Sequence, residues 1–209
     1  MKAALCETDI PLQLMEVIKK SRMFLAYGVA GVGKSLFLLK LASALCRGPI
    51  RCAYISTEET LHYEWVSRAP EKFENVEFVE AFNGDALIST LLIVREGGYG
   101  GIFVDSINGP FRHLLGFPGG LKKLSLASAI LYSAASQSAG AKVFSSAQVR
   151  SGEDLRVEAS GLSVLEFYFD AIAFMGFEEH RRFIMVERPS PTPKFYYRIT
   201  DRGLTFDTN

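Results

Sequence analysis

The sequence contains little cysteine and no paired cysteine motif. Cys6, Cys46 and Cys52 are the three cysteines among 209 residues, and no CxxC pair occurs. Disulfide-stapled secreted domains and cysteine-based zinc sites need more cysteines at shorter, regular spacings. We therefore expect reduced thiols, no disulfide framework, and a protein that works in a reducing, cytoplasmic compartment.

Long apolar runs and a net charge are also missing. The nearest approach to a membrane span, residues 164–177, carries Glu166 and Asp170. A spanning helix needs about 20 apolar residues, and residues 1–6 are too short for the apolar part of a signal peptide. We expect no membrane partner. Lys plus Arg and Asp plus Glu both total 23, so bulk charge alone does not hold a polyanion.

The composition nevertheless suits a folded domain. Hydrophobic residues make up 48% of the chain and charged residues 22%, which excludes a disordered protein. The length favours a single domain over residues 1–209, and no repeat or low-complexity linker divides it. A short N-terminal helix is expected at residues 10–20, with Asp9 as its N-cap.

Strand-like and helix-like segments alternate along the chain. Strands are expected at residues 22–27, 51–56, 76–80, 102–106 and 141–148, and helices at 34–46, 61–68, 83–96 and 121–139. Three further strand-like runs, at 171–177, 182–188 and 194–200, have no long helix between them. This order predicts an α/β fold: a mostly parallel twisted sheet with helices on both faces and an antiparallel C-terminal end.

A glycine-rich segment between the first strand and the next helix fits the P-loop pattern GxxxxGK[ST]. Glycines let successive backbone N–H groups point inward around an anion, and the helix N-terminus adds its positive dipole end. The alternative is an ordinary glycine turn before a helix. The expected nucleotide-binding residues are Gly28, Val29, Ala30, Gly31, Val32, Gly33, Lys34, Ser35 and Leu36.

This segment predicts ATP and Mg²⁺ as cofactors. Lys34 would contact the β and γ phosphates, and the Ser35 hydroxyl would ligate Mg²⁺. Asp105 ends a buried strand, GIFVD, which places it at the carboxyl edge of a parallel sheet, beside the P-loop. There it would serve the same metal, although many strand-terminal aspartates only cap turns.

Two further polar residues follow strands at the same edge. Glu58 comes directly after the second strand, where a carboxylate can accept a hydrogen bond from the water that attacks the γ phosphate. Glu59 is the second choice, and a helix N-terminal acid favoured by the dipole is the alternative. Gln148 ends the strand expected next to that of Asp105, where it can sense the γ phosphate. A lone glutamine there is more often structural.

These elements, in this order, resemble the RecA/RadA/KaiC superfamily of ATPases, and most of all a short archaeal-type RadA paralogue. The resemblance covers about residues 22–206. It is carried by residues 54–58 (YISTE), by 104–107 (VDSI) followed by Phe111 and Arg112, and by Gln148 with the two residues after it. The C-terminal pattern looks closer to KaiC-like members.

The resemblance implies further roles. An adenine-stacking residue is expected a few positions after the catalytic glutamate, at His62 or at Tyr63. Arg188 is the candidate for a residue that acts on the neighbouring subunit's nucleotide. Two loops, residues 107–120 and 149–162, would face nucleic acid. A role in DNA recombination or repair follows, with single-stranded DNA, a recombinase, or self-association as the expected partners.

The DNA hypothesis also draws on composition, because residues 106–152 contain no acid and single-strand binding needs basic and stacking side chains. The alternative is that residues 114–117 form a protein interface. Trp65 and the aromatic residues 167–169 are interpreted as core or interface packing. The DNA-contact candidates are Phe111, Arg112, Phe117, Lys122, Lys123, Arg150 and Arg156.

Three functions are therefore open. The first is a Mg²⁺-dependent ATPase in DNA repair, with Lys34, Glu58 and Gln148 as catalytic residues. The second is a non-catalytic adaptor that binds nucleotide as a structural ligand. The third is a KaiC-like signalling ATPase or autokinase that acts on protein.

Overall fold

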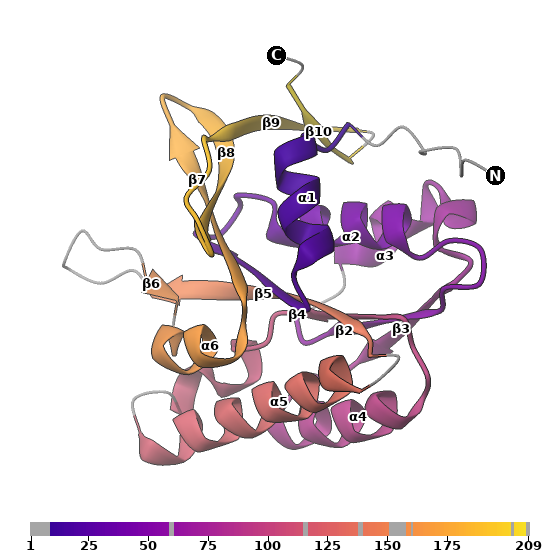
Figure 1. The fold of residues 1–209 in the computed structure, drawn as a ribbon, viewed down its shortest axis with the longest axis vertical. Helices are drawn as coiled ribbons and strands as arrows, with labels where there is room; N and C mark the ends of the chain where they lie inside the picture. Colours follow the sequence, from indigo (N-terminus) through magenta and orange to yellow (C-terminus); the bar gives the residue numbers. More distant parts are fainter. Residues whose placement is uncertain are drawn as a thin grey trace.

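A mixed sheet runs through the middle of the molecule, with helices against both of its faces (Figure 1). The computed structural model describes residues 9–58, 61–114, 117–137, 140–150, 158–159, 161–201 and 203–207, and only the backbone of residues 61, 62, 118, 150, 158 and 159. Ten strands lie within these ranges. The predicted α/β class follows directly from this arrangement.

Six strands form the parallel part of the sheet, in the spatial order β7, β1, β5, β4, β2, β3. Their bounds are β1 Met23–Gly28, β2 Cys52–Ser56, β3 Val76–Glu80, β4 Gly101–Asp105, β5 Lys142–Arg150 and β7 Ala171–Glu178. The expected neighbours β4 and β5 do pair, and β3 lies at one edge of the sheet.

The remaining strands continue the sheet antiparallel beyond β7, as the absence of long crossovers predicts. They are β8 Arg181–Arg188, β9 Phe195–Thr200 and β10 Gly203–Phe206. The short β6, Glu158–Ala159, pairs with the end of β5.

Two hydrophobic cores lie on opposite faces of the sheet. The first is covered by α1 Leu12–Lys20, α2 Lys34–Leu45 and α3 Leu61–Ser67, and the second by α4 Gly84–Glu96, α5 Pro118–Ser136 and α6 Leu162–Tyr168. Strand β1 is buried along its whole length: Phe24 and Ala26 face the first core, Leu25 and Tyr27 the second. A strand apolar on both faces is typical of a central parallel strand.

The N-terminal cap is wrong. Helix α1 begins at Leu12 after Pro11, and Asp9 makes no cap to it. The Asp9 carboxylate instead accepts the backbone N–H of Phe206 at 3.0 Å and pairs with Lys40 of α2. Pro11 occupies the N-cap position, so the Asp9 carboxylate is turned to these other partners. The Asn83 side chain caps α4, since its Oδ1 accepts the N–H of Ala86 at 2.9 Å.

The prediction of reduced thiols is also wrong for two cysteines. Cys46 and Cys52 form a disulfide across the turn that leads from α2 into β2, with Cα atoms 5.9 Å apart. The turn brings both side chains into the first core, where each is about 2% exposed or less. Cys6 lies outside the described residues.

Residues 107–120 are less irregular than expected. They contain the 3₁₀-helix η2, Gly109–Leu114, and α5 already begins at Pro118. A second 3₁₀-helix, η1, spans Pro70–Phe73, and α6 and β10 are separate elements that the pattern did not predict. None of the helices in the described part of the chain combines the length and hydropathy that crossing a membrane requires.

Candidate functional site

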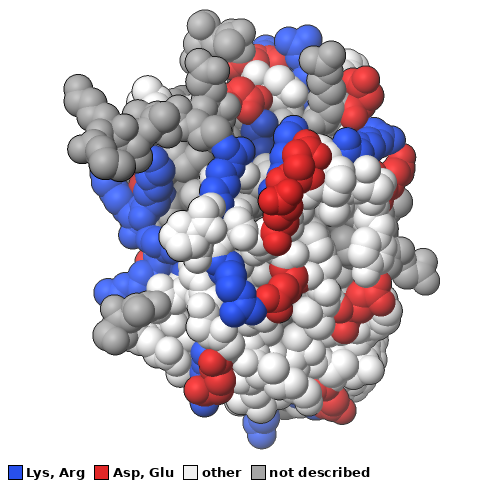
Figure 2. Space-filling model, turned by 90° about the vertical axis from the view of Figure 1, so that its right-hand side faces the viewer, with Lys and Arg blue, Asp and Glu red and all other residues white. Residues whose placement is uncertain are grey.

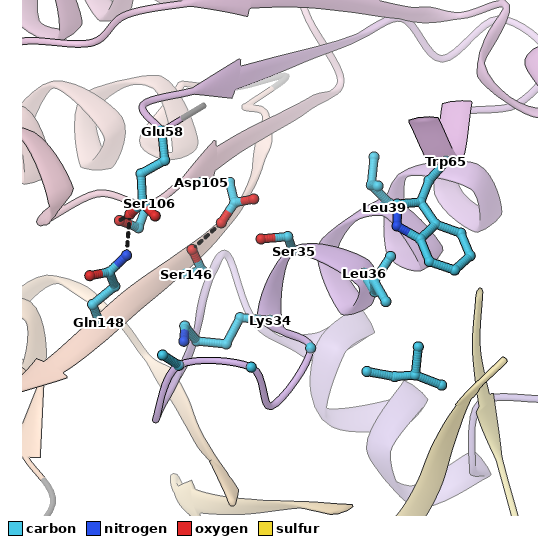
Figure 3. A pocket seen from close by; sticks show the side chains of 14 residues that line it. Lys34, Ser35, Leu36, Leu39, Glu58, Trp65, Asp105, Ser106, Ser146 and Gln148 are labelled. Carbon is cyan, nitrogen blue, oxygen red and sulfur yellow. Dashed lines mark hydrogen bonds between the residues drawn. The ribbon is translucent and has the colours of Figure 1, made fainter. Parts of the chain in front are cut away.

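A cavity of about 320 Å³ opens where the parallel strands end and α2 begins (Figure 3). Polar side chains occupy one end of it, and Leu36, Leu39 and Trp65 gather at the other. The lining residues are Ala30, Gly31, Gly33, Lys34, Ser35, Leu36, Leu39, Glu58, Trp65, Asp105, Ser106, Ser146, Gln148 and Ile199. The structure therefore brings together, in one place, the main residues that the sequence singles out.

The glycine-rich turn requires its glycines. A side chain at Gly28 would place Cβ 2.0 Å from the carbonyl oxygen of Met175 on β7. Gly31 and Gly33 have φ values of 75° and 106°, a left-handed region that other residues rarely adopt. The chain thus curls tightly between β1 and α2, and α2 starts at Lys34 with its N-terminus at the cavity.

The antiparallel strand β9 supports this turn from behind. The Tyr197 hydroxyl donates to the carbonyl oxygen of Val32 at 2.8 Å. A Cβ at Gly33 would lie 2.9 Å from the end of the Ile199 side chain. Burial raises the pKa of Tyr197 well above its usual range, so the hydroxyl remains a donor. Strands far from the turn in sequence therefore hold it in place.

Lys34 lies folded against the turn. Its Nζ donates to the carbonyl oxygens of Gly28 and Val29, at 2.9 and 3.0 Å, and the residue is 9% exposed. Burial lowers the pKa of Lys34, while the negative charges of Asp105 and Glu58 act in the opposite direction. The cation is thus held among weak carbonyl acceptors, which an anionic ligand can replace with stronger charge-assisted bonds.

Asp105 is fixed by two hydroxyl donors. The Tyr54 hydroxyl donates to Oδ2 at 3.0 Å, and the Ser146 hydroxyl donates to Oδ1. Burial, followed by the charge and hydrogen bond of Asp105, raises the pKa of Tyr54 well above its ordinary value. Tyr54 therefore keeps its proton and holds the carboxylate toward the cavity, which Ser35 also lines.

Glu58 belongs to a chain of hydrogen-bonded side chains. Its Oε1 accepts the Ser106 hydroxyl at 2.7 Å and also the side-chain amide of Gln148. The Gln148 amide oxygen in turn accepts the guanidinium of Arg112. Glu58 and Gln148 are thus in direct contact (Figure 3), and Arg112 extends their network to the surface. Glu59 lies outside the described residues.

Sequence reasoning missed Asn108, which is fully buried at this edge. Its Nδ2 donates to the carbonyl oxygen of Gln148 at 2.8 Å, and its Oδ1 accepts the N–H of Gln148 at 2.9 Å. Residues of β4 and β5 stay paired only as far as Val104 and Ser145. The amide of Asn108 therefore takes the place of a neighbouring strand and holds Gln148. An asparagine in a glycine- and proline-containing segment gives no signal of this by itself.

Of the apolar end of the cavity, the sequence predicts only Leu36 as a nucleotide-binding residue. Leu36 and Leu39 come from α2, Trp65 from α3 and Ile199 from β9. Trp65 packs on the first core, as expected, and it lines the cavity as well. The Tyr63 hydroxyl instead donates to Glu80 at 3.0 Å. The side chain of His62 lies outside the described residues.

Among the DNA-contact candidates, Phe111 is excluded as a stacking platform. It is 0% exposed and lies against Gly84 of α4, because η2 turns the ring into the second core. Lys123 forms an ion pair with Asp85 at 2.8 Å. Lys122 is exposed, and so is Phe117, at 66%.

Arg188, the candidate for action on a neighbouring subunit's nucleotide, is hydrogen-bonded within this chain. The Arg188 guanidinium donates to the carbonyl oxygen of Glu166 at 2.9 Å. The side chain of Arg150, the whole of Arg156 and two residues of the expected interface loop 114–117 lie outside the described residues. On the face shown in Figure 2, basic and acidic side chains are interspersed.

The residues present fit a nucleoside triphosphate with Mg²⁺. The turn is a concave backbone cradle beside a lysine, and a serine hydroxyl and a carboxylate lie within the same cavity. Within the described ranges no three His, Cys, Asp or Glu side chains gather as a metal cluster. Mg²⁺ suits such a site, because it usually takes only one or two protein ligands and completes its shell with phosphates and water.

The fold is that of a KaiC-like protein. The crystal structure of a KaiC-like protein from the hyperthermophilic archaeon Pyrococcus horikoshii OT3 matches with a TM-score of 0.67, over 90% of this chain and 89% of that chain. The sequences are 16% identical, so the likeness concerns the fold. No protein-family model matches the sequence, and no curated protein matches it. The predicted RecA-like α/β core is confirmed, and the finer resemblance to RadA paralogues stays a prediction.

Proposed function

We propose that this protein binds ATP at the cavity and hydrolyses it in a Mg²⁺-dependent reaction. The observation that carries the proposal is the shared lining of one cavity by the glycine-rich turn, Lys34, Asp105 and Glu58. The fold supports it as well: the turn follows β1 at the carboxyl edge of this chain's parallel sheet, and the chain has a KaiC-like fold.

Lys34 and the backbone N–H groups of the turn bind the phosphates. The Lys34 ammonium exchanges the carbonyls of Gly28 and Val29 for phosphate oxygens, which are stronger acceptors. Ser35 and Asp105 would hold Mg²⁺, which neutralises charge on the phosphates when it is bound. Tyr54 and Ser146 keep the Asp105 carboxylate oriented for this task.

Glu58 positions the attacking water. Its Oε1 already accepts two donors, Ser106 and Gln148, so the second carboxylate oxygen remains to accept a hydrogen bond from water. Gln148 lies between Glu58 and Arg112. The Gln148 amide therefore couples a movement of the Glu58 carboxylate to Arg112 at the surface.

Phosphate release from ATP, with and without Mg²⁺, tests this function. Glu58→Gln keeps the shape of the side chain but loses the negative charge, so turnover should fall about 100-fold or more while ATP affinity stays within a few-fold. The exposed Glu71→Gln is the matched control and should turn over like the unmodified protein. Unchanged turnover in Glu58→Gln would remove this residue from the mechanism. Tight ATP binding with no phosphate release would favour the adaptor, and label retained on the protein would favour an autokinase.

One observation favours a second candidate, a single-stranded nucleic acid partner in recombination or repair. Arg112 is exposed and bonds directly to Gln148, so a phosphodiester that recruits Arg112 would act on the Glu58 network. Anisotropy of labelled oligo(dT) should show binding that weakens with salt, and Arg112→Ala should weaken it more than Lys19→Ala on α1. Binding that does not depend on salt or on Arg112 would contradict this candidate, and sizing with and without ATP tests self-association.

A further inference from the structure

The cavity has a polar end, at Lys34, Ser35 and Asp105, which we call the phosphate end, and an apolar end, which we call the base end. The two ends differ in chemistry. Within the described lining, the base end consists of Leu36, Leu39, Trp65 and Ile199. These side chains carry one polar group, the indole N–H of Trp65, which is only a donor. Bases differ in the donors and acceptors on their edges, and a site that selects one base must pair with that pattern. These four side chains cannot distinguish one base from another by hydrogen bonding.

A second hollow of about 130 Å³ lies beside the base end and shares Leu36, Leu39 and Trp65 as lining residues. These three side chains therefore border both hollows.

The polar groups of this second hollow are already engaged or solvated. The Lys40 ammonium pairs with Asp9 and donates to the carbonyl oxygen of Leu204 at 2.8 Å. The Ser43 hydroxyl donates to the carbonyl oxygen of Lys40 at 2.9 Å. Lys72 is exposed, and a solvated charge contributes little selectivity. The second hollow therefore adds no fixed partner for a base edge.

Trp65 supplies a rigid flat surface at this end. The guanidinium of Arg68 covers the indole, 4.6 Å from its ring centroid. Arg68 is itself held by the carbonyl oxygen of Asp201 at 3.0 Å and by Glu64. Stacking on an aromatic ring tolerates every base, because each base has a π-face.

We propose that the cavity accepts nucleoside triphosphates as a class, and that it binds the four bases with similar affinity. The inference rests on the proposed function and specifies its substrate class. Lys34 and the glycine-rich turn recognise the triphosphate, which all four ligands share, and Trp65 with its apolar neighbours stacks on the base without reading its edges.

Isothermal titration of the full chain with ATP, GTP, CTP and UTP, each with Mg²⁺, tests the inference. The four dissociation constants should lie within about tenfold, with purines ahead of pyrimidines because they stack over a larger area. A preference above about tenfold for any one base would overturn it and leave the triphosphate site intact. Inorganic tripolyphosphate separates the two failures: if neither it nor any nucleotide binds, the proposed function fails as well.

A pair of variants at Trp65 sharpens the test. Trp65→Ala should weaken all four nucleotides by a similar factor, roughly five- to thirtyfold, and leave tripolyphosphate unchanged, whereas Trp65→Phe should recover most of the loss. Circular dichroism and the unchanged tripolyphosphate affinity verify that the variants are folded. Loss of affinity for ATP alone would show that Trp65 belongs to an adenine-selective site and would contradict the inference.

Discussion

The two ends of the cavity are built in different ways. The phosphate end comes from one short contiguous turn and from residues that terminate neighbouring parallel strands, and hydrogen bonds fix its side chains. The base end is assembled from α2, α3 and β9, which are far apart in sequence, and it is defined by shape alone. Polar geometry is thus specified locally by the backbone, whereas the apolar wall depends on how the whole domain packs.

Lys34→Ala should have the largest effect, because it removes the only described lysine that lines the phosphate end. We expect ATP affinity to fall by about 100-fold or more, and hydrolysis to be lost, since charge-assisted bonds to phosphate dominate this end. Titration with ATP compares the affinity of this variant with that of Trp65→Ala. The smaller loss expected for Trp65→Ala gives the contribution of the base end to ATP binding. A greater loss from Trp65→Ala would reverse the ranking of the two ends.

Asn108→Ala should have the next largest effect, although Asn108 does not touch the cavity. Without its amide the strand end that carries Gln148 loses two hydrogen bonds, and the Glu58 network loosens. We expect kcat to fall roughly 10- to 30-fold while KM changes less than threefold, since a positioning residue acts on the reaction rather than on binding. Asn75→Ala, at the amino ends of β2 and β3 and away from the cavity, is the control. A change in KM alone would contradict this role.

Removing the disulfide should alter stability without altering either end of the cavity. The double variant Cys46→Ser with Cys52→Ser opens a short loop, and the chain-entropy estimate for such a loop is about 2 kcal/mol of unfolding free energy. Urea denaturation should show this loss, and nucleotide titration should remain unchanged. If affinity falls as well, the staple between α2 and β2 also shapes the phosphate end.

The smallest expected effect is a pH dependence of the phosphate end. Burial places the pKa of Lys34 below 10.5, so the free protein loses this charge at a lower pH than an exposed lysine does. ATP affinity should decline as the pH rises through that lowered pKa, and Lys34→Arg should remove the decline because arginine stays charged. Over the same window, between the lowered value and 10.5, the folded state should gain stability, because the neutral form no longer carries the burial penalty. A pH profile shared by both proteins would contradict the assignment to Lys34.

Much of the phosphate end could be predicted from the sequence, because its information is local. Glycines at fixed positions before a lysine specify a backbone conformation, and parallel strands bring their carboxyl ends to one edge, so Asp105, Glu58 and Gln148 were placed correctly at one cavity. The sheet, including its antiparallel end, followed from the spacing of apolar runs.

The failures share a physical cause. Whether Phe111 faces solvent or the second core, and whether Trp65 lines a cavity, depends on contacts with α4 and α2 that no local pattern encodes. The disulfide likewise follows from how tightly one turn returns the chain, which three scattered cysteines do not reveal.

The hydrogen bond from Tyr197 to Val32 couples the last strands to ligand binding at the glycine-rich turn. Because β9 is bonded to the turn itself, a ligand that stiffens the turn also suppresses local opening of β9 and of the strands paired with it, β8 and β10. Hydrogen–deuterium exchange at the amides of residues 195–206 should therefore slow on triphosphate binding, and this measurement does not require turnover.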